Sequence, residues 1–118
     1  MENKVSYTQV VKWQGLSNTI YKFKLYGLDH EFEDIAACYI LTKRRNDGRW
    51  IPIYIGQTLN LKLISQRFHL PCVVKNKATH VCIYSDGMDD DQYRKLVERD
   101  LFRRLSPICL TGRQSIWL

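Results

Sequence analysis

The chain has 118 residues, the length of one globular domain, and 45% of them are hydrophobic, which is enough to bury a core. With 25% charged and 12% aromatic residues, the composition excludes a mainly disordered chain. The formal net charge of +6 suits a phosphate-rich partner, and it suits equally well a solvated surface without one. We expect one domain over residues 1–118, with a core at about 35–110 and an N-terminal extension at 1–34.

The first residues are polar and lack a signal-peptide core, and no apolar run approaches the ~20 residues that span a bilayer. We therefore expect a cytoplasmic protein that makes no membrane contact and whose cysteines are free, mostly buried thiols. The four cysteines are Cys38, Cys72, Cys82 and Cys109. His69 before Cys72 and His80 before Cys82 leave zinc as an alternative, although these spacings match no standard zinc motif.

The first half of the chain predicts strands. Residues 1–18 show little pattern apart from Trp13, a candidate packing anchor, whereas residues 20–26 alternate as a half-buried strand does. Residues 28–33 are polar and predict a connection. Residues 35–42 and 50–55 predict a hairpin around the turn signal Asp47-Gly48, with Pro52 at a position that needs no amide hydrogen.

The second half predicts two helices and one strand. Residues 59–70 read as a helix with Leu61, Ile64 and Phe68 on one face, Thr58 as its cap and Pro71 at its end. After a short basic connection, residues 79–84 predict a strand and residues 89–105 a helix. The predicted fold class is α+β, with a small, mostly antiparallel sheet packed against helices.

Two short motifs stand on the predicted hairpin, Cys38-Tyr39-Ile40 and Tyr54-Ile55-Gly56-Gln57-Thr58, and a helix containing Glu98 leads to Ser106-Pro107. This order resembles the GIY-YIG nuclease superfamily. The resemblance covers about residues 35–110, and it implies a metal-dependent endonuclease that hydrolyses phosphodiester bonds in DNA. It also implies that the hairpin brings both motif tyrosines next to the middle of the helix that carries Glu98.

The resemblance assigns roles to particular residues. Tyr39 and Tyr54 would position and deprotonate the attacking water, and Glu98 would be the protein ligand of Mg²⁺ or Mn²⁺. The family places its catalytic arginine eight residues after the motif glycine, where this chain has Ile64. Arg67, one helical turn later, is the nearest replacement, since side chains on a helix lean toward its N-terminus.

Each assignment has an alternative that involves no chemistry. Tyr39 and Tyr54 are ordinary residues for a sheet, and Glu98 could form an ion pair with Arg94 four residues earlier. Arg67 could be a solvated surface residue. His69 could act as a proton donor, contact phosphate, or simply lie at the end of the helix.

Nucleic-acid contacts are expected at two places. The strand end and helix start contribute Gly56, Gln57 and Thr58, and the basic hairpin loop contributes Lys43, Arg44, Arg45 and Arg49. The resemblance favours DNA over RNA. The alternative to an endonuclease is a catalytically degenerate domain of the same fold that binds nucleic acid or another protein. Ile64 and Leu110, which depart from the family's pattern, motivate that alternative.

Overall fold

The computed structural model describes residues 7–110 and forms one five-stranded antiparallel sheet with helices on both faces. The strands are β1 (Gln9–Gln14), β2 (Ile20–Gly27), β3 (Ala37–Arg44), β4 (Trp50–Thr58) and β5 (His80–Tyr84). The helices are the 3₁₀ helix η1 (Leu61–His69) and the α-helices α1 (Pro71–Lys75) and α2 (Asp91–Leu105). The predicted α+β class and antiparallel sheet are therefore confirmed.

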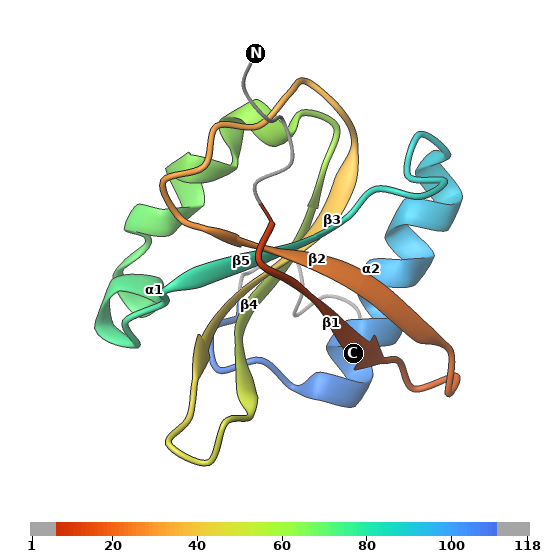
Figure 1. The fold of residues 1–118 in the computed structure, drawn as a ribbon. Coiled ribbons are helices and arrows are strands. Elements are labelled where there is room, and N and C mark those ends of the chain that lie inside the picture. The colour runs from red at the N-terminus through yellow and green to blue at the C-terminus, as the bar shows by residue number, and fades with distance from the viewer. Residues whose placement is uncertain (1–6, 111–118) are drawn as a thin grey trace.

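The strand order in the sheet is β1-β2-β5-β3-β4, so β5 lies between two strands that precede it in the chain. As Figure 1 shows, η1 and α1 lie on one side of the sheet and α2 lies on the other. β4 is an edge strand, which agrees with the prediction for Pro52, because an edge tolerates a residue without an amide hydrogen. The carbonyls of Pro52 and Ile53 accept hydrogen bonds from the amides of Ile108 and Cys109, so the segment after α2 covers part of this edge.

The strands alternate between two hydrophobic cores, one on each face of the sheet. We call the core beneath α2 the α2-side core and the core beneath η1 the η1-side core. The α2-side core contains Val11, Trp13, Tyr21, Phe23, Leu25, Ala36, Cys38, Ile40, Ile55, Cys82, Met88, Val97 and Leu101. The η1-side core contains Ala37, Tyr39, Leu41, Ile53, Tyr54, Leu61, Ile64, Val73, Val81, Ile83 and Cys109.

The N-terminal part of the chain contributes two strands to the sheet. β2 lies where alternation predicted it, whereas β1 was not predicted. Val11 and Trp13 point into the α2-side core while Lys12 faces solvent, but this alternation is too short to distinguish β1 from a loop.

The helix after β4 differs in detail from its prediction. It is a 3₁₀ helix, and its cap is Asn60, whose side chain accepts a hydrogen bond from the amide of Lys62. Thr58 is not the cap because it still belongs to β4, and its hydroxyl bonds to the backbone of Asn60. Leu70 is extended, as a residue before proline prefers, and Pro71 then opens the separate helix α1.

α2 begins two residues later than predicted. The side chain of Asp90 caps it by accepting from the amide of Tyr93, and Ser106 ends it in the left-handed conformation just before Pro107. Among residues 7–110, no helix combines the length and apolar character that crossing a membrane requires.

Candidate nucleic-acid interface

The register of the β3–β4 hairpin places Tyr39 directly opposite Gly56. The ring of Tyr39 lies over this glycine so closely that a Cβ atom on residue 56 would be 2.6 Å from Tyr39 Cζ. Gly56 is therefore required by the close approach of an aromatic ring. This contact gives the glycine of the second motif a specific structural role.

The two motif tyrosines stack on each other in the η1-side core. Their ring centroids are 6.1 Å apart with an interplanar angle of 16°, and the side chains of Tyr39 and Tyr54 are only 2% and 6% exposed. Burial raises the pKa of Tyr39 above its usual range, and the neighbouring Tyr54 adds to this increase. The phenol of Tyr39 therefore stays protonated at physiological pH.

Arg67 lies beside the hydroxyl of Tyr39, where its positive charge acts to lower the pKa of that tyrosine. It occupies the last turn of η1, and the residue as a whole is exposed. Arg67 is thus both exposed and next to Tyr39, and its role as a replacement of the family's arginine stays a prediction. Ile64, at the family's own arginine position, is 3% exposed and belongs to the η1-side core.

Glu98 does not belong to the face that carries the tyrosines. It is fully buried on α2, in a stripe with Arg94, Val97 and Leu101. Its described neighbour on the sheet is Cys38, whose pKa is raised by burial and further by the charge of Glu98. The predicted juxtaposition of Glu98 with the tyrosines is therefore not found, because Cys38 and Tyr39 are consecutive residues of a strand and point to opposite faces.

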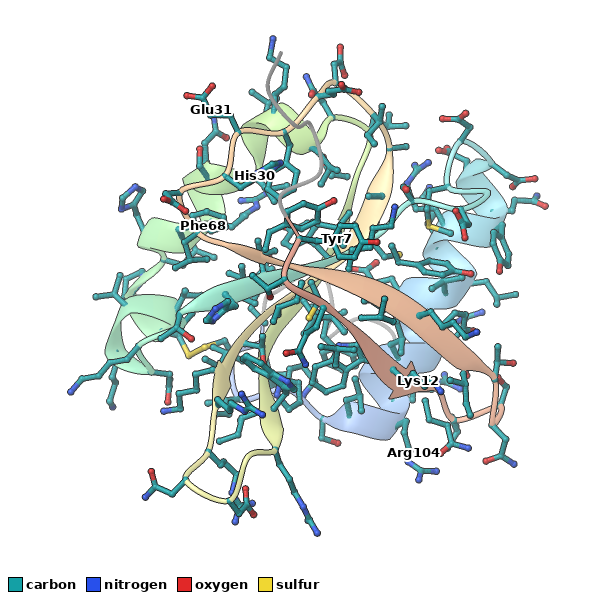
Figure 2. All side chains as sticks on the ribbon, in the orientation of Figure 1. Tyr7, Lys12, His30, Glu31, Phe68 and Arg104 are labelled. Carbon is teal, nitrogen blue, oxygen red and sulfur yellow. A yellow bond between two sulfur atoms is a disulfide. The ribbon has the colours of Figure 1, made fainter. Side chains whose placement is uncertain are left out.

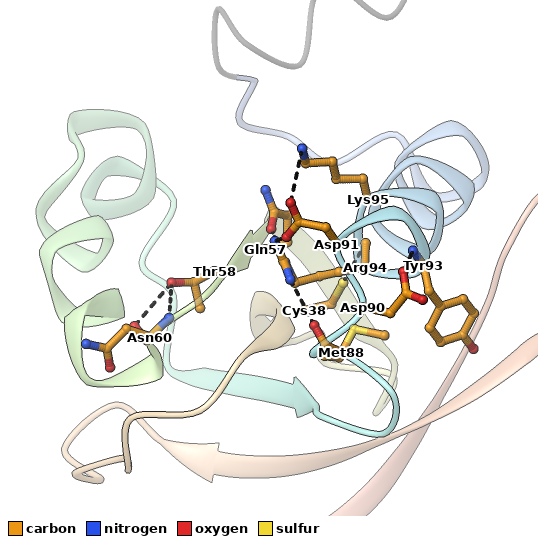
Figure 3. A network of polar contacts seen from close by, with 10 residues as sticks. All are labelled: Cys38, Gln57, Thr58, Asn60, Met88, Asp90, Asp91, Tyr93, Arg94 and Lys95. Atoms are coloured by element: carbon orange, nitrogen blue, oxygen red, sulfur yellow. Dashed lines mark hydrogen bonds and ion pairs between the residues drawn. The ribbon is translucent and has the colours of Figure 1, made fainter.

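Arg94, the alternative partner of Glu98, is itself buried on α2 and makes several hydrogen bonds. Arg94 is 2% exposed, and its guanidinium donates to Asp91, to the side chain of Gln57 and, at 2.9 Å, to the carbonyl of Met88 (Figure 3). Gln57, predicted to bind nucleic acid, thus points to the α2 side and bonds to a buried arginine. Thr58 uses its hydroxyl for the loop at Asn60.

Glu98 and the two tyrosines are not arranged so that one metal ion could contact all three. Mg²⁺ and Mn²⁺ favour carboxylate oxygens and retain several waters. The carboxylate of Glu98 is fully buried and lies on the opposite face of the sheet. Nor do residues 7–110 bring together three or more His, Cys, Asp or Glu side chains that could hold a metal ion, which also leaves the alternative of a zinc site without support there.

The predicted basic loop is exposed, but its arginines already have partners. The guanidinium of Arg44 lies over the ring of Trp50, 5.3 Å from its centroid, and donates to the carbonyl of Gly48. Arg45 and Arg49 lie 3.4 and 3.9 Å from the carboxylate of Asp47. Such exposed ion pairs contribute little to stability, so phosphate can replace Asp47 at small cost.

A second basic segment meets this loop at the same end of the sheet. His80 pairs with Thr42 at the end of β3, and the rings of Trp50 and His80 are 5.2 Å apart. Lys75 and Lys77, which precede β5, are exposed and belong to the segment that leads into this end. His69 is exposed at the end of η1.

The expectation of four free thiols is wrong for two of the cysteines. Cys72 on α1 and Cys109 after α2 form a disulfide, whereas Cys38 and Cys82 are free and buried as predicted. The pairing could not be predicted because 37 residues separate the two cysteines, and only the fold brings α1 next to the segment along β4. Asn76 donates to the carbonyl of Cys72 and lies within 3.8 Å of both sulfurs.

Comparisons of the chain with protein families, with curated proteins and with solved structures found no match. The resemblance to the GIY-YIG superfamily therefore stays a prediction from the motif residues of the sequence.

Proposed function

We propose that this chain is a GIY-YIG-like domain that binds the phosphodiester backbone of nucleic acid, DNA in the first instance, without a metal site of the family's type. The observation that carries this proposal is the position of Arg67, an exposed arginine whose guanidinium lies beside the buried hydroxyl of Tyr39. A fixed guanidinium with an open side suits phosphate, because its planar fork can donate two parallel hydrogen bonds.

The basic end of the sheet supports the same proposal. The arginines of the hairpin loop lie at the start of β4, and Gly56, beneath Tyr39, lies near its other end. A nine-residue strand spans about 30 Å, so cations stand at both ends of one strand. A nucleic-acid backbone is long enough to contact both groups, and such contacts would be sensitive to salt and largely independent of sequence.

The test is fluorescence anisotropy with labelled duplex DNA and duplex RNA over a series of salt concentrations. Arg67→Gln should weaken binding about tenfold, since a charge-assisted hydrogen bond contributes about 1.5 kcal/mol. Lys62→Gln is the matched control, because Lys62 is an exposed cation at the other end of the same helix. Equal affinities for the two variants would contradict the assignment of Arg67, and a wild-type protein that binds neither duplex at low salt would favour a protein-interaction role.

A metal-dependent endonuclease is the second candidate, because Tyr39 lies close to Tyr54, Gly56 and Arg67, although Glu98 lies on the opposite face of the sheet. The same DNA should then be incubated with Mg²⁺, with Mn²⁺ and with chelator. Cleavage that needs metal and disappears in a folded Glu98→Gln variant would establish this candidate. Binding without cleavage in any of these conditions would exclude it.

A further inference from the structure

A cavity of about 700 Å³ opens on the η1 side of the sheet, beside the start of η1 and between β2, β5 and the loop after β2. Its apolar floor is formed by Ile35, Leu61 and Ile83. A volume of this size is within the range of sites that hold small organic ligands. The cavity contains neither Arg67 nor a motif tyrosine, so it is separate from the proposed backbone contact.

One wall of the cavity carries positive charge. Lys22 and Lys24 lie on β2, both exposed, and they point to the same side of the sheet because they are two residues apart. Lys24 also lies over the ring of Tyr7, 5.2 Å from its centroid. Two lysines with exposed ammonium groups on one strand suit an anionic group such as a phosphate.

The end of β2 and the loop after it add rings and carboxylates to the cavity. Tyr26, His30 and Phe32 form a cluster in which the centroids of Tyr26 and His30 are 4.5 Å apart. Glu31 and Glu33 belong to the same loop and also line the cavity. Figure 2 shows Glu31 and His30 together on this loop. Carboxylates accept hydrogen bonds from amino groups, and aromatic rings provide surface for a planar base.

We propose that this cavity binds one nucleotide unit of single-stranded nucleic acid. The phosphate lies at Lys22 and Lys24, and the base lies against the aromatic cluster with its edge toward Glu31 and Glu33. This orientation follows from charge, because Glu31 and Glu33 repel phosphate, whereas Lys22 and Lys24 attract it. Asp86, which follows β5, is the third carboxylate of the lining, and it offsets part of the attraction that the two lysines provide. A duplex cannot present a base in this way, since its bases are stacked and paired.

The carboxylates also predict a preference among bases. Cytosine has an amino group at position 4, which can donate to Glu31 or Glu33, whereas thymine has a carbonyl there. A single strand of deoxycytidine should therefore bind more tightly than one of thymidine, by about tenfold for one charge-assisted hydrogen bond. The two strands differ little in size, which makes them a matched pair of ligands.

The experiment measures anisotropy of labelled (dC)₁₂ and (dT)₁₂ with the full chain. Lys22→Ala with Lys24→Ala should weaken (dC)₁₂ binding at least tenfold, and Glu31→Gln with Glu33→Gln should reduce the preference for (dC)₁₂. Lys12→Ala is the control, because Lys12 pairs with Lys22 across β1 and β2 but does not line the cavity, and it lies away from His30 and Glu31 in Figure 2.

Equal losses in the Lys12 control and in the double lysine variant would overturn the proposal, and so would equal affinity of the wild-type protein for both strands. Arg67→Gln separates this site from the proposed backbone contact. If duplex binding depends on Arg67 while (dC)₁₂ binding depends on Lys22 and Lys24, both proposals stand. If the double lysine variant binds (dC)₁₂ as the wild-type protein does, the cavity proposal alone fails.

Discussion

The two faces of the β3–β4 hairpin differ in what holds them together, although they are built from alternating residues of the same two strands. On the η1 side, Tyr39 stacks on Tyr54 and lies over Gly56, and a disulfide joins α1 to the segment after α2 that runs along β4. On the α2 side, a buried arginine donates to two side chains and a carbonyl. The first face leaves Arg67 exposed beside a tyrosine, whereas the second buries its cation and its glutamate.

This difference shows how a strand separates motif residues that are adjacent in sequence. Tyr39 follows Cys38 and Gln57 follows Gly56, but the members of each pair serve different faces. A motif that is continuous in the sequence therefore contains residues of both faces. Some lie near the exposed Arg67 on the η1 side, and others contact the buried Arg94 on the α2 side. Four substitutions or treatments test this comparison, beginning with the one of largest expected effect.

Reduction of the Cys72–Cys109 disulfide should destabilise the η1 side most. The disulfide closes a loop with a sequence separation of 37, and the loss of such a constraint costs about 4 kcal/mol in the chain-entropy model. Urea unfolding of the wild-type protein with and without dithiothreitol measures this effect. The variant with Cys72→Ala and Cys109→Ala should be indifferent to the reductant, and a wild-type protein with the same unfolding free energy in both conditions would contradict the prediction.

Arg94→Met should destabilise the α2 side by about 3 kcal/mol, because it leaves Gln57 and the carbonyl of Met88 without their buried donor. Lys95→Met is the matched control on the same helix. Lys95 is exposed and its only described ion pair is with Asp91 at 3.9 Å, so its loss should cost less than ~0.5 kcal/mol. If the two variants lost similar amounts of unfolding free energy, the hydrogen bonds of Arg94 would not be what stabilises the packing of α2.

Gly56→Ala should lower the free energy of unfolding by about 2 kcal/mol, because the added methyl group would be 2.6 Å from the ring of Tyr39. The ring is enclosed in the η1-side core and has little room to move. A double-mutant cycle with Tyr39→Leu gives the decisive measurement. If the ring causes the loss, Gly56→Ala should cost clearly less in the Tyr39→Leu background, and an unchanged cost would assign the loss to the backbone.

The elements with strong local signals were predictable from the sequence. β2 alternates, β3 and β4 flank the turn at Asp47-Gly48, and α2 carries acidic residues before its first turn and ends before Pro107. β1 has too little alternation, and its place beside β2 depends on the α2-side core that receives Trp13. The 3₁₀ form of η1 could not be predicted because periodic apolar residues indicate a helix but not its type.

The candidate site was predictable where it depends on one strand pair and the helix that follows. Tyr39, Tyr54, Gly56 and Arg67 come together as expected, because hairpin register and helix direction are both local properties. The position of Glu98 depends on which face of the sheet α2 covers. Sequence patterns predict that a helix packs against the sheet, but not against which face. The disulfide was not predicted because it also depends on how distant segments pack against each other.

Asp100→Asn should have the smallest effect and should depend on pH. Asp100 accepts hydrogen bonds from the amide and hydroxyl of Ser17 and from the hydroxyl of Tyr21, at 2.7–2.8 Å. Burial raises its pKa, but these hydrogen bonds outweigh burial and hold the pKa below its ordinary value. A carboxylate with a depressed pKa stabilises the folded state above its unfolded pKa of about 3.9 and loses this contribution as pH falls through the lower folded value.

Thermal unfolding from pH 7 to pH 2 therefore tests whether the α2 side is fixed by polar bonds at both ends of its helix. At pH 7 the wild-type protein should be more stable than Asp100→Asn by about 1 kcal/mol, and the difference should shrink below about pH 4. Tyr21→Phe removes one of the three donors and should reduce the pH-dependent part of the difference without abolishing it. A difference that stays constant down to pH 2 would mean that the shape of Asp100, and not its charge, holds the β1–β2 turn against α2.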